Sequence, residues 1–132
     1  MHYVTVDSAT GEPPGEWPEH FQGNARLQPI PAPFGPQGAA VFAVHFEAGG
    51  RSRPHVHEHG QVLVVLTGRG IVGDRSSRRT VLQGDVVVTR PGEWHWHGAA
   101  PDSPMTHVTV QMPGATNWDV DEGDWADGYA GT

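Results

Sequence analysis

Two pairs of alternating histidines constrain the fold of this chain more than any other feature of its sequence. One residue separates His55 from His57, and one residue separates His95 from His97. Successive side chains of a β-strand point to opposite faces, so each pair would lie on one face of its strand. A third donor, Gln61, opens the apolar run that follows the first pair. The sequence therefore predicts strands whose polar side chains meet in one interior and share a single ion.

The remainder of the sequence predicts an all-β fold. Eighteen glycines and twelve prolines lie between short apolar runs, which is typical of many strands joined by tight turns. Gly68 to Gly70 should end the strand that begins at Gln61. The clearest strands are expected at residues 39–47, 61–66, 71–72, 80–82, 86–88 and 105–112.

A length of 132 residues fits a single domain. We divide it into a Pro-rich N-terminal arm (1–37), a barrel core (38–113) and an acidic C-terminal tail (114–132). The tail carries Trp118 and Trp125 as candidate docking points. The apolar residues of the arm should pack either on the outside of the barrel or across a subunit interface: Trp17, Phe21, Leu27, Ile30 and Phe34.

The strand expected at residues 105–112 has one polar and one apolar face. His107, Thr109 and Gln111 alternate with Val108 and Val110. If the two valines pack outward, the three polar side chains point into the barrel and add a further titratable group to its interior.

Charge and composition exclude several classes of protein. The formal net charge is −7, whereas a nucleic-acid partner requires a basic face, so we expect no nucleic acid. The absence of cysteine rules out disulfides and thiolate metal sites. No stretch approaches about 18 apolar residues, and the N-terminus lacks the features of a secretory signal. We therefore expect no membrane association and a cytoplasmic protein.

Two stretches of the chain resemble the paired motifs of the cupin superfamily. The first is carried by Gly50 (one residue off the usual spacing), His55, His57, Gln61 and Gly68, and the second by Gly84, Asp85, Pro91, Gly92 and His95. The resemblance implies a double-stranded β-helix, or jelly-roll, barrel of about eight strands with a metal ion in its mouth. It also implies the four metal ligands, which would be His55, His57, Gln61 and His95.

Such a ligand set suits one divalent transition metal. Imidazole nitrogen binds the divalent first-row metals well, and carboxamide oxygen is a harder, weaker ligand. Mn or Fe is expected first, with Ni, Co and Zn as further candidates. Gln61 stands where the common motif has glutamate, so the bound ion would keep a formal charge of about +2, which favours Lewis-acid chemistry. For His97 three roles stay open: ligand, acid or base in the pocket, and packing residue.

Residues 91–101, together with Met105-Thr-His107, resemble a group of small bacterial monocupins that includes the manganese-dependent hydroxynitrile lyases. This resemblance implies a lyase acting on a small organic substrate, with His107 as its base. It suggests Phe42, Val44 and Gln111 as pocket residues. The alternatives are a cupin dioxygenase and a non-catalytic binder of small molecules. We also expect a homodimer or tetramer, because the arm's apolar residues and the sheet edges need cover.

Overall fold

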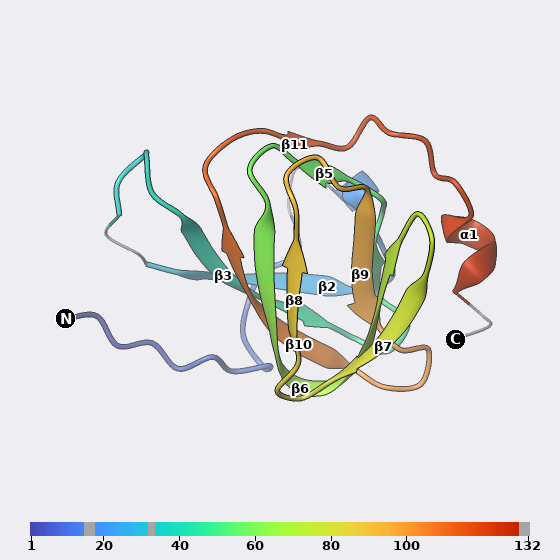
Figure 1. The fold of residues 1–132 in the computed structure, drawn as a ribbon. Coiled ribbons are helices and arrows are strands. Elements are labelled where there is room, and N and C mark those ends of the chain that lie inside the picture. Colours follow the sequence, from blue (N-terminus) through green and yellow to red (C-terminus); the bar gives the residue numbers. More distant parts are fainter. Residues whose placement is uncertain (15–17, 32–33, 130–132) are drawn as a thin grey trace.

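The chain forms a nearly closed, antiparallel β-barrel in a computed structural model, which describes residues 1–14, 18–31 and 34–129 (Figure 1). The arm residue Trp17 lies outside the described part. Two short helical segments are described, Pro18–His20 and α1 (Trp125–Gly128), and neither is long and apolar enough to cross a membrane. The strands are β1 (Phe21–Gln22), β2 (Ala25–Ile30), β3 (Ala40–Phe46), β4 (Arg51–Ser52), β5 (Val56–His57), β6 (Gln61–Asp74), β7 (Arg78–Leu82), β8 (Val86–Thr89), β9 (His95–Ala99), β10 (Met105–Gln111) and β11 (Thr116–Asn117). The prediction of an all-β jelly-roll is confirmed.

Strand β6 organises the barrel because both sheets share it. Its first half pairs with β10 and β8, and its second half pairs with β9 and β7. The register with β10 shifts between Thr106 and His107, which is a β-bulge. The prediction that Gly68 to Gly70 ends this strand is therefore wrong. The bulge and the positive φ of Gly68 (80°) bend the strand from one sheet into the other without ending it.

Replacing Gly68 with alanine is expected to destabilise the fold strongly. Its φ is positive, and an added Cβ would overlap the carbonyl oxygen of Pro104. Gly84 is a matched control, because its φ is also positive (91°) but nothing lies within 4 Å of an added Cβ. Urea unfolding should show a loss of about 1 kcal/mol for Gly84→Ala and about 3 kcal/mol or more for Gly68→Ala. Equal losses would contradict a steric role for the Pro104 contact.

Side chains of β3, β6 and β10 alternate between the barrel interior and its outer face. His107 lies in register with Val44 on one side and Val65 on the other. Thr109 occupies the next inward position, and both His107 and Thr109 have no exposed surface. The structure thus places the polar face of β10 inside the barrel. Thr109 lies in register with Phe42 and Leu63, and Gln111 of the next row lies in register with Gln61 and with Ala40, which is exposed at the start of β3.

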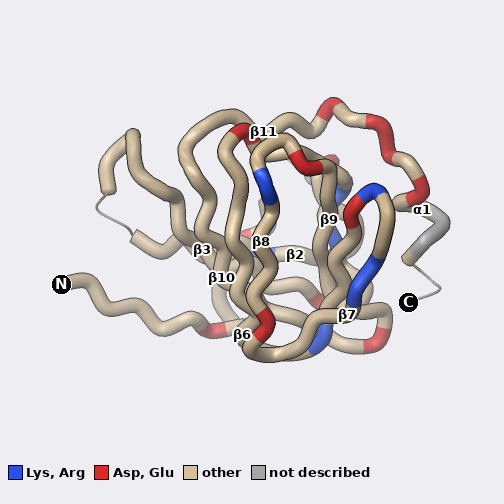
Figure 2. The backbone as a smooth tube through the Cα atoms, in the orientation of Figure 1, with Lys and Arg blue, Asp and Glu red and all other residues tan. Residues whose placement is uncertain are grey.

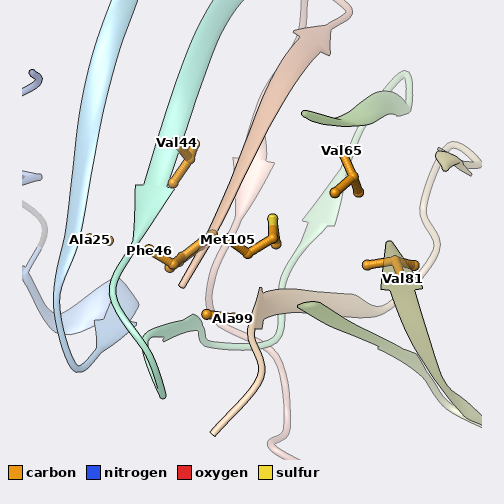
Figure 3. Packing of buried hydrophobic residues seen from close by; sticks show 7 residues of the cluster. All are labelled: Ala25, Val44, Phe46, Val65, Val81, Ala99 and Met105. Carbon is orange, nitrogen blue, oxygen red and sulfur yellow. The ribbon is translucent and has the colours of Figure 1, made fainter. Parts of the chain in front are cut away.

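Apolar side chains fill the end of the barrel at which Met105 pairs with Phe46 (Figure 3). Phe21 and Leu27 of the arm pack against this cluster, whereas Phe34 is 59% exposed. The core residues drawn in Figure 3 are Ala25, Val44, Phe46, Val65, Val81, Ala99 and Met105. Polar side chains lie at the opposite end of the barrel, where β5 and the start of β6 are found.

The described part of the acidic tail, up to Tyr129, is docked along the barrel and includes α1. Trp125 is buried in a second apolar cluster with Ile71, Trp94 and Trp96, on the face of β9 opposite its two histidines. Ion pairs join the tail to the chain before β5 and to the hairpin between β6 and β7: Arg53 with Glu122, Arg75 with Asp121, and Arg78 with Asp124. Figure 2 shows acidic positions spaced along this segment above that hairpin. The tail is therefore part of the described fold.

Candidate metal centre

Three buried histidines meet at the polar end of the barrel. The backbones of His55 and His95 form a β-bridge, with N to O distances of 3.0 and 3.1 Å in the two directions. Their ring centroids are 4.3 Å apart, and the His57 ring lies 4.9 Å from His55 and 5.2 Å from His95. Each residue is at most 6% exposed. The two motifs, distant in sequence, are thus neighbours in space.

Hydrogen bonds donated by Nδ1 fix how two of these rings face the site. His55 Nδ1 lies 2.8 Å from the carbonyl oxygen of Arg53, and His95 Nδ1 lies 2.9 Å from that of Glu93. A carbonyl oxygen can only accept, so each Nδ1 carries the hydrogen and donates it. The Nε2 atom of a neutral ring then presents a lone pair to the site, which is the arrangement that ligating histidines adopt.

Gln61 completes the predicted ligand set. Its Oε1 atom lies 3.3 Å from His95 Nε2, so two lone pairs face each other unless the amide is turned or a cation lies between them. His57 Nε2 is buried and has no hydrogen bond of good geometry, although the Gln61 amide lies close enough to favour its protonated form. Buried acceptors that converge without donors are the polar groups a metal ion would satisfy. The residues present therefore fit a metal ion.

His97 lies deeper in the barrel than the predicted ligands, with its ring 5.0 Å from that of His107. One ring nitrogen from each of His55, His95 and His97 lies within 4.8 Å of the others, so these three could also hold an ion. This set differs from the sequence motif by exchanging His57 for His97. We favour His57 as the ligand, because a hydrogen bond anchors its Nδ1, whereas both His97 ring nitrogens lack a partner.

Burial keeps these imidazoles neutral at pH 7. Loss of hydration lowers the pKa of His55 and His97 well below 6.5, and it lowers the pKa of His57 to about 4. The pKa of His95 is lowered for the same reason. Nearby imidazoles add to the effect, because a second positive ring in the cluster is unfavourable. A neutral ring is the form that binds a metal.

His107 faces the same interior from β10. Its Nδ1 lies 3.0 Å from Thr109 Oγ1, and its Nε2 is buried without a partner. Burial lowers the pKa of His107 to about 3, with a smaller contribution from the nearby His45, so the ring is neutral. A neutral ring that donates from Nδ1 to Thr109 can accept a proton at Nε2.

The predicted pocket residues occupy two different places, the apolar core and the neighbourhood of Thr116. Val44 is buried in the apolar core next to His107, and Phe42 is half-buried against that core. Gln111 donates from Nε2 to Thr116 Oγ1 at 3.3 Å. A cavity of about 250 Å³ reaches the site, but none of these three lines it. Its lining includes Leu63, Val72, Val87, Thr89, His95 and His97.

Sequence reasoning did not single out Thr116, and it named Trp118 only as a docking point of the tail, without its contact to a candidate ligand. Thr116 lies 3.0 Å from His57 Nδ1, and Trp118 packs on the His55 ring at 4.2 Å between centroids. Both belong to the acidic tail, whose docking has no local sequence signal beyond its tryptophans. The cavity residues Leu63 and Thr89 follow from strand register, since Leu63 shares a face with Gln61 and Thr89 pairs with Gln61.

Comparison with known proteins agrees with the barrel and its histidines. Residues 42–111 match the cupin domain family. The chain belongs to the cupin family. Among related cupins, the (R)-mandelonitrile lyase of Granulicella tundricola is 39% identical over 104 residues, which is 78% of this chain and 77% of the relative.

Solved cupin structures share the fold. A cupin-like protein of Thermotoga maritima gives a TM-score of 0.75 at 33% identity, covering 82% of this chain and 84% of that one. An acetylacetone dioxygenase of Acinetobacter johnsonii gives a TM-score of 0.72 at 17% identity, covering 93% and 80% of the two chains. At that identity the second match supports the fold alone.

Proposed function

We propose that this cupin is a metal-dependent lyase that cleaves small cyanohydrins, the class to which (R)-mandelonitrile belongs. The observation that carries the proposal is the convergence of neutral, buried imidazoles on one point, in a chain that is 39% identical to a mandelonitrile lyase. His55, His57, Gln61 and His95 would hold the metal. The metal would supply Lewis-acid polarisation of a substrate oxygen.

The protein's own residues would bind the substrate and move its proton. His107 Nε2 accepts the proton of the substrate hydroxyl, while Thr109 Oγ1 holds the opposite ring nitrogen. The C–C bond to the nitrile breaks, the oxygen becomes a carbonyl, and the proton returns from His107 to the released cyanide. The core residues Val44 and Phe46 exclude water from one side of the imidazole. The anion formed beside His107 offsets the low basicity that burial gives its ring.

Manganese is the metal we propose, because glutamine adds a hard oxygen donor to the three imidazoles. Metal-stripped protein should not cleave (R)-mandelonitrile, and Mn²⁺ should restore cleavage equally in air and under anaerobic conditions. Metal-dependent turnover that needs oxygen would instead indicate a dioxygenase. Metal binding without turnover of any cyanohydrin would indicate a small-molecule binder.

We further infer that the cupin forms a homo-oligomer through the outer face of one sheet. Val86 and Val88 on β8 are 58% and 68% exposed, and the residues in register with them are uncharged. An apolar, charge-free face suits a second copy of itself. Its two rows are Val108, Val64 and Val86, and Val41, Val110, Val62 and Val88, whereas Ala43, in register with Val108, is fully buried.

The substitution Val88→Glu is expected to convert this oligomer into a 14.2 kDa monomer in sedimentation velocity. In the oligomer the introduced carboxylate would be buried, either facing the same carboxylate of the second copy or against apolar side chains, and both arrangements are unfavourable. Thr80→Glu, at an exposed position of β7 in the other sheet, is the control and should leave the oligomer unchanged. A wild-type monomer would contradict the inference.

A further inference from the structure

The C-terminal segment from Ala115 to Trp125 contacts two candidate metal ligands, and it lies outside the residues 42–111 that match the cupin domain. Thr116 Oγ1 lies 3.0 Å from His57 Nδ1. The Trp118 ring lies over the His55 ring, with centroids 4.2 Å apart and planes inclined by 31°. The segment therefore reaches the site from a part of the chain that the shared domain does not include.

Contacts at both ends hold this segment in place. At one end β11 pairs with β5, and the Glu58 amide donates to the Ala115 carbonyl at 3.0 Å. At the other end Trp125 is 2% exposed and donates from Nε1 to the Ser52 carbonyl at 3.0 Å. Between them Trp94 Nε1 donates to the Asp121 carbonyl at 2.8 Å. Trp118 and Thr116 are thus fixed by backbone pairing and by buried anchors.

The His57 ring depends on this segment in a way that the other two rings do not. His55 and His95 donate from Nδ1 to carbonyl oxygens only two residues away in their own stretches, Arg53 and Glu93. Nδ1 of His57 instead meets Thr116, which is 59 residues away in sequence. A hydroxyl oxygen can accept two hydrogen bonds, so Thr116 can accept from His57 and also from Gln111.

We propose that the C-terminal segment completes the metal centre, with Thr116 as a positioning residue for His57 and Trp118 as the cover over His55. Thr116 holds the hydrogen on His57 Nδ1 and so keeps the Nε2 lone pair directed at the ion. Trp118 shields the His55 side of the barrel mouth, which leaves the cavity beside His95 and His97 as an approach to the site. This inference rests on the metal centre in the proposed function.

Metal binding and docking of the segment should then be linked in both directions. If the segment improves metal affinity by holding His57, the bound metal must stabilise the docked segment by the same factor. The ion pairs of Glu122, Asp121 and Asp124 are exposed and add little to this coupling. The hydrogen bond between Thr116 and His57 should therefore carry most of this coupling, which can be tested by removing the Thr116 hydroxyl group.

The test measures Mn²⁺ affinity by calorimetry on the metal-stripped full chain. Thr116→Val keeps the shape of the side chain but removes the acceptor, and it should weaken Mn²⁺ binding about 10- to 100-fold, as for other groups that orient ligands. Thr116→Ser restores the hydroxyl and should stay within about 3-fold of the wild type. Thr80→Val, at an exposed position of β7, is the matched control and should not change affinity.

Hydrogen exchange of residues 113–129 provides the second readout. Mn²⁺ should slow exchange of this segment in the wild type, and slow it less in Thr116→Val. Unchanged affinity in a folded Thr116→Val protein would overturn the positioning role, and exchange that does not respond to Mn²⁺ would overturn the linkage. A wild-type chain that binds none of Mn²⁺, Fe²⁺, Co²⁺, Ni²⁺ or Zn²⁺ would overturn the metal centre itself, so the two failures can be distinguished.

Discussion

Replacing His107 with alanine is expected to lower the turnover of (R)-mandelonitrile by about 10²- to 10⁴-fold, the usual contribution of a positioned acid or base. The His107 ring is fully buried on the inner face of β10, and its Nε2 has no protein partner. His107 is not one of the four residues that we assign to the metal, His55, His57, Gln61 and His95, so metal affinity should stay nearly unchanged. Steady-state kinetics and Mn²⁺ titration on the same preparation measure both quantities.

His57→Ala is the matched comparison, because it removes a buried imidazole of the same interior that we assign to the metal. It should lose metal affinity and turnover together. Loss of metal in His107→Ala as well would make His107 a ligand. Full turnover in His107→Ala would indicate that another group accepts the proton, for which His97 is the candidate, because its ring lies 5.0 Å from that of His107.

The metal-free protein is expected to lose about 5 kcal/mol of unfolding free energy between about pH 6.5 and 4.5 from His57 and His107 alone. Burial lowers their pKa values to about 4 and about 3, whereas an unfolded histidine titrates near 6.5. Above about pH 6.5 both states are neutral and there is no effect. As the pH falls below about 6.5, these histidines become protonated in the unfolded chain but stay neutral in the folded chain, so the free energy of unfolding decreases.

Urea unfolding of metal-stripped protein at several pH values checks this expectation. The slope should be about 1.4 kcal/mol per pH unit for each buried histidine, so His107→Gln should reduce it by about that amount. Burial also lowers the pKa values of His55, His95 and His97, which acts in the same direction. A free energy of unfolding that is flat across this range would contradict neutral burial of the site histidines.

Strand alternation was enough to predict which histidines face the site, because the direction of a side chain is a local property of a strand. His95 and His97 point inward while Trp94 and Trp96 pack on the other face, as the sequence indicates. The course of β6 past Gly70 could not be predicted in this way. A glycine that ends a strand and a glycine that bends one look alike until the partner strand sets the register.

Long-range contacts account for the rest of what sequence reasoning missed. The bond between Thr116 and His57 joins residues 59 positions apart, and its existence depends on how the tail docks at Trp125 and Ser52. The cavity beside His95 likewise depends on the spacing of β8 from β9, which no local pattern encodes. Family motifs located the candidate ligands, and the packing around them had to come from the structure.

The positions of the tryptophans make their fluorescence a probe of the site. Trp94 and Trp96 lie on or beside β9, next to the histidines on its opposite face, and Trp118 lies over His55. Trp125 anchors the segment that carries Trp118. Four of the five tryptophans of the chain therefore lie either in the cluster on the face of β9 opposite its histidines or over His55. A change in the wavelength or intensity of tryptophan emission on metal binding is therefore expected to report on the histidine cluster and its cover.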